Sequence, residues 1–191
     1  TSWEPTGRQL SVAAVLAEVA ALRATRPHLH HVVITGGEPL LQATALLALT
    51  TGLKAAGAWV TLETNGTRKV AAPFDFVSLS PKLASSTPQD PKLAASHQRR
   101  RLNLTALRWW LANYAYQLKF VVDSAADEAE IVDLLSHLPG LTCERIFIMP
   151  QGVQVSELHD REQLCLDLCL RHGWRYTPRT HIELFGHTRA T

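Results

Sequence analysis

The order in which strand-like and helix-like patterns follow one another is the feature that most limits what this chain can fold into. Short runs rich in β-branched and aromatic residues alternate with longer amphipathic stretches from one end to the other. Strands are expected at residues 31–35, 58–64, 74–80, 116–122, 145–150 and 174–178, and helices at 11–22, 40–56, 127–138 and 160–173. This alternation predicts a parallel α/β sheet of βαβ units, either open and doubly wound or curled into part or all of a barrel.

Two segments carry more specific expectations. The first helix has Ser11 as its N-cap, and its apolar stripe predicts one buried face made of Val12, Val15, Leu16, Val19 and Leu22. Residues 84–107 hold two prolines and three consecutive arginines, so we expect either a long loop or an excursion from the scaffold, which would cover a site. Residues 1–191 otherwise form a single domain by their length.

The composition excludes several classes of protein. A formal charge of +2 argues against a nucleic-acid coat, and no apolar stretch approaches the ~20 residues that cross a bilayer. Three cysteines without a preceding signal peptide favour a reducing cytoplasm over a disulfide framework. We therefore expect a cytoplasmic protein without nucleic-acid or membrane partners, in which Trp109 and Trp110 dock a helix and residues 99–101 form a solvated basic loop.

Small, polar and charged residues gather where four of the expected strands end. These ends are Thr35-Gly36-Gly37-Glu38-Pro39, Glu63-Thr64-Asn65-Gly66, Ser80-Pro81-Lys82 and Met149-Pro150-Gln151-Gly152. Parallel α/β folds bind ligands at the carboxyl ends of their strands, and glycines there let a ligand approach the backbone. The pattern predicts a cavity for a small polar molecule with a positive end, which the carboxylate of Glu38 would accept.

Lys119 lies in the middle of an apolar strand. Alternation sends Leu118, Phe120 and Val122 to one face and Lys119 to the other. Two interpretations stay open: the ammonium reaches a carboxylate or a ligand inside a barrel, or the strand lies at an edge with Lys119 in solvent.

With these motifs in place, the sequence resembles a known family. The blocks VVITGGEPLLQ, LETNGT, SLSPKL, LKFVV, IFIMPQG and RTHIELFGHTRAT are similar, in the same order, to those of 7-carboxy-7-deazaguanine synthases. Gly-Gly-Glu-Pro alone is shared by radical S-adenosylmethionine enzymes at large, whereas the Ser-Pro-Lys and Met-Pro-Gln-Gly blocks and the histidine of RTHIEL narrow the resemblance to this synthase. The resemblance implies a partial (β/α) barrel and a homodimer.

The resemblance also implies a reaction in queuosine-type 7-deazapurine biosynthesis. With S-adenosylmethionine, a [4Fe-4S] cluster and Mg²⁺, such an enzyme converts 6-carboxy-5,6,7,8-tetrahydropterin to 7-carboxy-7-deazaguanine with loss of ammonia. A donor such as flavodoxin or ferredoxin supplies the electron that yields a 5′-deoxyadenosyl radical, and this radical removes a hydrogen from C6 of the pterin. The protein positions the cofactor and the substrate.

Carried over residue by residue, the resemblance assigns roles to the strand ends. It implies that S-adenosylmethionine binds at Gly36, Gly37, Glu38, Pro39, Gly66, Ser80, Pro81, Lys82 and Gln151. Thr64 and His181 are implied to contact the pterin, and Arg179 and Arg189 are further candidates to pair with its carboxylate. No residue of this chain is assigned a catalytic role.

The cluster motif is the part of the family pattern that the sequence does not show. Three cysteines in a Cys-x3-Cys-x2-Cys pattern would precede Gly36, but the chain opens with TSWEPTG, which resembles the segment after the third cysteine. We therefore expect a truncated chain, inactive by itself, whose first strand, cluster loop and Mg²⁺-binding threonine lie upstream of Thr1.

Other groups of potential metal ligands are better explained by the fold. Cys165, Cys169 and His172 imitate the cluster spacing, but the two cysteines are four residues apart on an amphipathic helix and are expected in the core. His28, His30 and His31 precede a strand, on the face opposite the expected site, and are expected in a solvated loop.

Two alternative functions stay open. The first is a cluster-free module that binds S-adenosylmethionine or the pterin without catalysis. The second is an unrelated α/β nucleotide enzyme, against which the TGGEPLL segment argues, because it lacks both the Gly-x-Gly-x-x-Gly spacing and the Lys-Ser/Thr of a P-loop.

Overall fold

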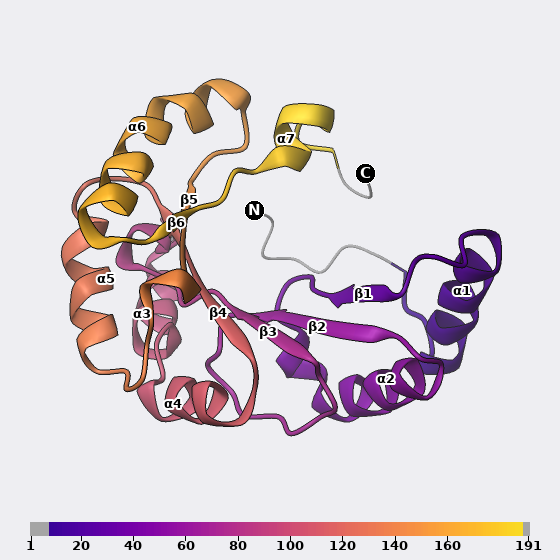
Figure 1. The fold of residues 1–191 in the computed structure, drawn as a ribbon. Coiled ribbons are helices and arrows are strands. Elements are labelled where there is room, and N and C mark those ends of the chain that lie inside the picture. Colours follow the sequence, from indigo (N-terminus) through magenta and orange to yellow (C-terminus); the bar gives the residue numbers. More distant parts are fainter. Residues whose placement is uncertain (1–7, 189–191) are drawn as a thin grey trace.

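The strands form one parallel sheet in a computed structural model that describes residues 8–188. The six strands lie in the order in which they occur in the chain: β1 (His31–Ile34), β2 (Trp59–Thr64), β3 (Phe76–Leu79), β4 (Tyr116–Val122), β5 (Ile146–Pro150) and β6 (Arg175–Tyr176). All five pairings are parallel. Because each strand adds on the same side as the last, the sheet curls into an arc (Figure 1), and the expected partial (β/α) barrel is confirmed.

Most of the helices lie along the outside of the arc (Figure 1). The helices are α1 (Val12–Thr25), α2 (Ala43–Ala55), α3 (Pro91–Arg100), α4 (Leu104–Asn113), α5 (Asp127–Ser136), α6 (Val155–His172) and α7 (Thr180–Phe185). Side chains cap several of them: the Ser11 hydroxyl accepts a hydrogen bond from the backbone N–H of Ala14, as expected, and the Asn103 side chain accepts one from that of Ala106. No helix in the described part of the chain is long and apolar enough to cross a membrane.

The core lies between the convex face of the sheet and the helices. In β4 the alternate residues Tyr116, Leu118, Phe120 and Val122 are buried, while the intervening side chains are only half-buried and face the concave side. Trp110 of α4 is fully buried, and its indole N–H donates to the carbonyl of Arg68 at 2.8 Å. The docking of α4 through its aromatic side chains is therefore confirmed, and the concave face is left for polar residues.

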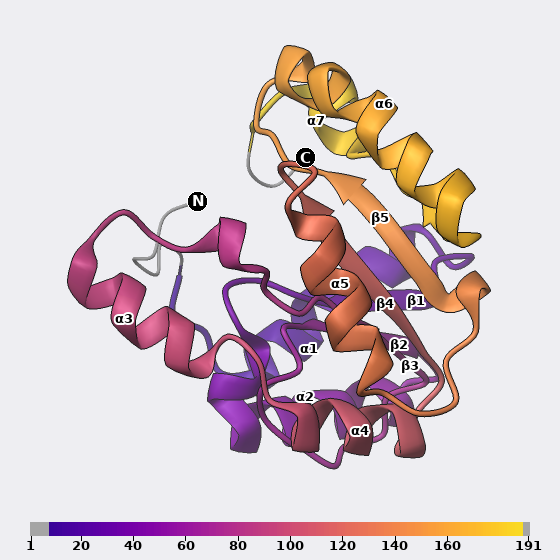
Figure 2. The ribbon, with the colours of Figure 1, turned by 90° about the vertical axis from the view of Figure 1, so that its left-hand side faces the viewer.

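Residues 84–107 are not the loop that we expected. They contain α3 and the first turn of α4, and Figure 2 shows α3 standing apart from the other helices. Asp90 begins α3, because its carboxylate accepts hydrogen bonds from the N–H groups of Lys92 and Leu93, and Pro91 occupies the first helical position. Arg99 and Arg100 are exposed as expected, but the Arg101 side chain is only 11 % exposed, so the prediction of a solvated loop was wrong for this residue.

The apolar stripe of α1 is buried less than expected. Leu16 and Val19 pack against the core, but no residue of α1 is fully buried and Leu22 is 54 % exposed. The reason is that α1 packs chiefly on α2, where Gly52 lets Leu16 approach closely. The prediction of one buried face therefore holds for the middle of the helix and was wrong at Leu22.

Candidate functional site

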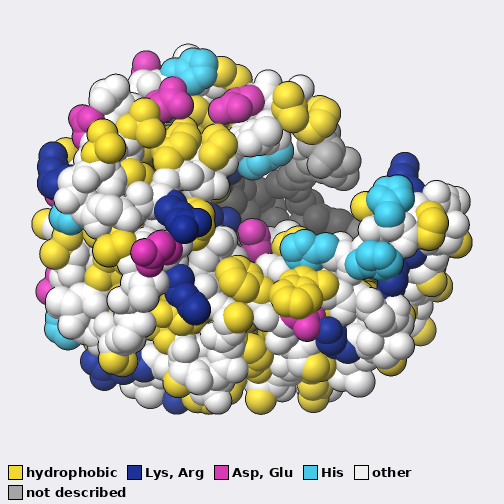
Figure 3. Space-filling view, in the orientation of Figure 1, with side chains coloured by type: hydrophobic (Ala, Val, Ile, Leu, Met, Phe, Trp, Pro, Cys, Tyr) yellow, Lys and Arg dark blue, Asp and Glu magenta, His cyan; other side chains and the backbone are white. Residues whose placement is uncertain are grey.

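A cavity of about 560 Å³ lies at the carboxyl ends of the strands, on the concave side of the sheet. The space-filling view shows that the arc encloses a hollow (Figure 3). Residues of β2 to β5, and of the segments that follow β1 to β6, line the cavity. They are Thr35, Gly36, Gly37, Glu38, Glu63, Thr64, Asn65, Ser78, Ser80, Pro81, Lys82, Ser85, Ser86, Thr87, Pro88, Lys119, Val121, Asp123, Met149, Gln151 and Arg179.

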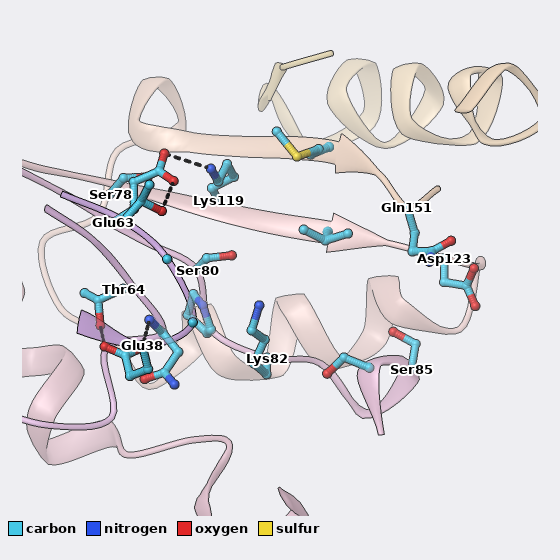
Figure 4. A pocket seen from close by; sticks show the side chains of 18 of the residues that line it. Glu38, Glu63, Thr64, Ser78, Ser80, Lys82, Ser85, Lys119, Asp123 and Gln151 are labelled. Carbon is cyan, nitrogen blue, oxygen red and sulfur yellow. Dashed lines mark hydrogen bonds and ion pairs between the residues drawn. The ribbon is translucent and has the colours of Figure 1, made fainter. Parts of the chain in front are cut away.

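Glu38 joins the ends of β1 and β2. One of its carboxylate oxygens accepts hydrogen bonds from the Thr64 hydroxyl at 2.6 Å and from the backbone N–H of Leu40 at 3.1 Å. The other accepts one from the backbone N–H of Asn65 at 2.9 Å (Figure 4). A carboxylate has about four lone-pair sites, so one position remains for a donor from a ligand. Glu38 therefore organises the turn after β2 as well as facing the cavity.

The glycines before Glu38 leave free space beside the backbone. Gly36 has a φ of 136°, a conformation that favours glycine, and a Cβ placed on it would meet no protein atom within 4 Å. A Cβ on Gly37 would likewise meet none. Both main chains are therefore open to a ligand in the cavity.

Lys119 forms an ion pair with a carboxylate on the neighbouring part of the sheet. Its Nζ donates to Glu63 at 3.3 Å, and Glu63 also accepts a hydrogen bond from the Thr35 hydroxyl at 3.1 Å (Figure 4). Strand β4 lies inside the sheet and the Lys119 side chain is 16 % exposed, so the interpretation as a solvated edge strand was wrong. The pair places one positive and one negative charge on the concave face between β2 and β4.

Two further cations face the cavity without a recorded side-chain acceptor among the described residues. The Lys82 side chain points into the space between Glu38 and Ser85 (Figure 4). Burial lowers the pKa of Lys82, the carboxylate of Glu38 opposes this, and the nearby charges of Lys119 and Arg179 lower it further. The Nε of Arg179 is buried without a hydrogen-bond partner, and burial also lowers the pKa of this guanidinium. Uncompensated cations of this kind suit a ligand with anionic groups.

The remaining residues expected at the site divide into three groups. Ser80, Pro81 and Gln151 line the cavity. Pro39, Gly66 and His181 do not line it: Gly66 is buried and packs against Leu107 and Leu79, and His181 lies on α7. Arg189 lies outside the described residues.

Sequence reasoning did not single out Asp123, which also lines the cavity. Residues 85–88 line it too, and they belong to the segment 84–107 that was expected to cover a site. Asp123 directly follows β4, a position that could have drawn attention to it. Its carboxylate accepts a hydrogen bond from Arg161 at 2.9 Å and is therefore already paired. The sequence did not show which residues of 84–107 would line the cavity, because serine, threonine and proline are typical of any turn.

The cysteines are not placed to hold a cluster at this cavity. Cys165 and Cys169 are buried in the core, as expected, and burial raises the pKa of both thiols, to about 12 for Cys165. Residues 8–188 contain no group of three or more His, Cys, Asp or Glu side chains that could hold a metal ion. His28 and His30 are exposed, and His31, at the start of β1, lies 2.7 Å from the Thr61 hydroxyl.

Similar sequences and a similar solved structure point to the same family. No model of a protein family matches the chain. A protein of Halobacterium salinarum described as 7-carboxy-7-deazaguanine synthase is 43% identical over 203 residues, covering 100% of this chain and 77% of the relative. A protein of Rhodopirellula baltica with the same description is 37% identical over 194 residues, covering 100% and 73%. The crystal structure of QueE from Escherichia coli shares the fold, with a TM-score of 0.63 and 24% identity over 93% of this chain and 75% of that one.

Proposed function

The chain belongs to the family of 7-carboxy-7-deazaguanine synthases, and on this premise we propose that it takes part in converting 6-carboxy-5,6,7,8-tetrahydropterin to 7-carboxy-7-deazaguanine with loss of ammonia. The observation that carries the proposal is the cavity itself, where four strand ends bring the Gly-Gly-Glu turn, Thr64, Lys82 and Gln151 together. The product belongs to queuosine-type biosynthesis, so the reaction would be that of a lyase in a tRNA-modification pathway.

The residues of the cavity fit S-adenosylmethionine. The open space beside Gly36 and Gly37 admits the methionine part to the backbone, and the remaining lone pair of Glu38 accepts its ammonium. Lys82 and the orphaned Nε of Arg179 supply positive charge for carboxylates of the cofactor or the pterin. When bound, S-adenosylmethionine supplies the hydrogen-abstracting chemistry of this superfamily. The chain's own part is to orient the two ligands and to exclude water between them.

Thr64 is also proposed to contact the pterin. Its hydroxyl donates to Glu38 and accepts a hydrogen bond from the N–H of Gly66 at 3.1 Å, so its position is fixed from both sides. A hydroxyl held in this way presents its remaining lone pair in one direction, which suits a contact with the pterin. Pro39 and Gly66 support the two turns rather than touch the ligand, and His181 would need α7 to approach the cavity.

The described residues do not fit a [4Fe-4S] cluster or Mg²⁺. The three cysteines are free, two of them lie in the core, and no ligand group for a metal occurs among residues 8–188. The alternative function is a module that binds S-adenosylmethionine or the pterin without catalysis.

The experiment combines turnover and binding in the full-length protein. The protein is reduced anaerobically with S-adenosylmethionine and the carboxypterin, product is measured by mass spectrometry, and binding by calorimetry. Gly37→Val should abolish both, because its side chain would project into the cavity, while the melting temperature stays near that of the wild type. Ala55→Val, at an exposed position of α2, is the matched control.

The outcomes of this experiment distinguish the two functions and test whether the cavity is the site. Product from the wild type and none from Gly37→Val supports the synthase. Binding without product supports the binding module. Product that survives Gly37→Val overturns the assignment of the cavity.

The finer features of the proposal rest on the family alone. We propose Mg²⁺ and an iron–sulfur cluster, held by ligands outside residues 8–188, as further cofactors. We also propose flavodoxin or ferredoxin as the electron donor and a homodimer as the assembly. A cytoplasmic location is supported by the three free cysteines, which a reducing compartment would preserve.

A further inference from the structure

The segment after β3, residues 80–88, forms one wall of the cavity, with Lys82 pointing inward (Figure 4). At its start, the N–H of Ser80 donates to the carbonyl of Thr64 at 2.7 Å, and the side chain of Leu83 is 2 % exposed in the core. Most other hydrogen bonds of the segment are internal. For example, the hydroxyl of Ser86 donates to the carbonyl of Leu83 at 2.6 Å, and the backbone N–H of Ser86 donates to the same carbonyl at 3.0 Å. The wall therefore depends on contacts that reach it from other elements.

Arg101 and Glu130 supply two of these contacts. The Nη1 of Arg101 donates to the carbonyl of Lys82 at 3.0 Å and also forms an ion pair with Glu130 of α5. The other carboxylate oxygen of Glu130 accepts a hydrogen bond from the N–H of Ala84 at 2.8 Å. The two side chains are 11 % and 21 % exposed, and both also line a second cavity of about 780 Å³. This Arg101–Glu130 pair thus holds the peptide groups on either side of Leu83.

The guanidinium of Arg101 is itself fixed in orientation. Its Nε donates to the side-chain oxygen of Gln98 at 2.9 Å, and its backbone N–H donates to the carbonyl of His97 at the end of α3. The neighbouring arginines make no such contacts: Arg100 bonds to Ser96 within α3, and Arg99 is exposed. Of the three consecutive arginines, Arg101 is thus the one whose side chain reaches the wall of the cavity.

We propose that Arg101 and Glu130 are positioning residues that hold Lys82 against the ligand, an inference that rests on the proposed function. The carbonyl of Lys82 is held from behind by Arg101 while its ammonium extends into the cavity. Because hydrogen bonds to charged groups are stronger than neutral ones, the pair restrains the main chain of Lys82 more firmly than a turn would. An ammonium held in place loses less conformational freedom when an anionic ligand binds.

The test uses two measurements on the full-length protein. The first is the pH at which the rate of acylation of Lys82 is half-maximal. This rate is monitored by peptide mass spectrometry, and the measurement needs no ligand. The second is the dissociation constant of S-adenosylhomocysteine, a stable probe, measured by calorimetry. The variants are Arg101→Gln, Glu130→Gln and the conservative Arg101→Lys.

Two control variants separate positioning from general stability. Arg99→Gln removes the same charge from the same segment without touching the wall. Lys54→Gln breaks another partly buried ion pair, in which Lys54 lies 2.7 Å from Asp75 and neither residue lines the cavity. Lys54→Gln should lower the melting temperature and leave both measurements unchanged.

We expect Arg101→Gln and Glu130→Gln to weaken S-adenosylhomocysteine binding roughly tenfold. The acylation midpoint of Lys82 should move up towards the ordinary value of 10.5, because the released side chain gains solvent. In Arg101→Lys the dissociation constant of S-adenosylhomocysteine and the acylation midpoint of Lys82 should both stay close to their wild-type values, since this variant keeps the ion pair. If Arg101→Gln does not fold, the other two variants decide.

The outcomes of the two measurements can be told apart. An unchanged midpoint in Arg101→Gln or Glu130→Gln overturns the proposal, as does a changed midpoint with unchanged affinity. A wild type that does not bind the probe contradicts the proposed function instead, and the acylation midpoint then decides by itself whether the pair positions Lys82.

Discussion

Replacing Glu38 by glutamine tests the hydrogen bonds that join β1 to β2. The amide keeps one acceptor oxygen, so its NH₂ group must face either Asn65 or the donors of Thr64 and Leu40. In the better orientation one hydrogen bond from a backbone N–H is lost, and the other two become neutral and about half as strong. Because Glu38 is only half-buried, we expect the free energy of unfolding to fall by about 2–3 kcal/mol.

For a chain of this length the loss corresponds to a fall in melting temperature of about 4–12 °C, measurable by circular dichroism. Glu18→Gln is the matched control. It removes a surface carboxylate that lies 3.0 Å from Arg8, where the side chains of Arg8 and Glu18 are 73% and 52% exposed. This change should alter the melting temperature little. A Glu38→Gln protein that melts within about 1 °C of the wild type would show that Glu38 does not stabilise the junction of β1 and β2, because three hydrogen bonds to a charged acceptor cannot be weakened without cost.

Packing and charge elsewhere in the molecule give further predictions. Gly66→Ala should cost about 2–4 kcal/mol in urea unfolding, because Gly66 has a φ of 73° and a Cβ there would lie 2.7 Å from Leu107; an unchanged midpoint would contradict this. Iodoacetamide at pH 8 should modify exposed Cys143 well before Cys165, because burial raises the pKa of Cys165 to about 12. Equal modification rates of the two cysteines, measured by mass spectrometry, would show that Cys165 is not buried. Burial opposes ionisation of Asp75, but hydrogen bonds from the Lys54 side chain and a backbone N–H outweigh it and hold the pKa of Asp75 below its ordinary value. Its contribution to stability is therefore present above about pH 4 and lost as the pH falls through the folded-state pKa, so Asp75→Asn should flatten the acid side of the stability profile.

The sequence was sufficient for elements whose burial follows a regular period. Strand β4 was predicted at its observed bounds because one face of it is buried and the other is not, which produces strict alternation. Helix α3 was missed because it has no buried residue, so no apolar period marks it, and only its Asp90 cap and Pro91 start define it. Helix α7 was missed because six residues are too few to show a period.

The candidate site was predictable in place but not in its contacts. The carboxyl ends of parallel strands must meet at one edge, so the position of the cavity followed from the order of the strands. The partners of each side chain did not, because they join residues far apart in the chain, as Glu38 does with Thr64 and Arg101 with the carbonyl of Lys82. The role of His181 stays a prediction, since its side chain does not line the cavity.

The central claim is that the cavity at the strand ends holds the S-adenosyl ligand. Hydrogen exchange of the full-length protein with and without S-adenosylhomocysteine measures this directly, because bound ligand slows exchange of the amides that it covers. We expect slower exchange in peptides covering residues 35–39, 63–66 and 80–87. Slower exchange confined to residues 99–105 at the second cavity, or none at the strand ends, would contradict it.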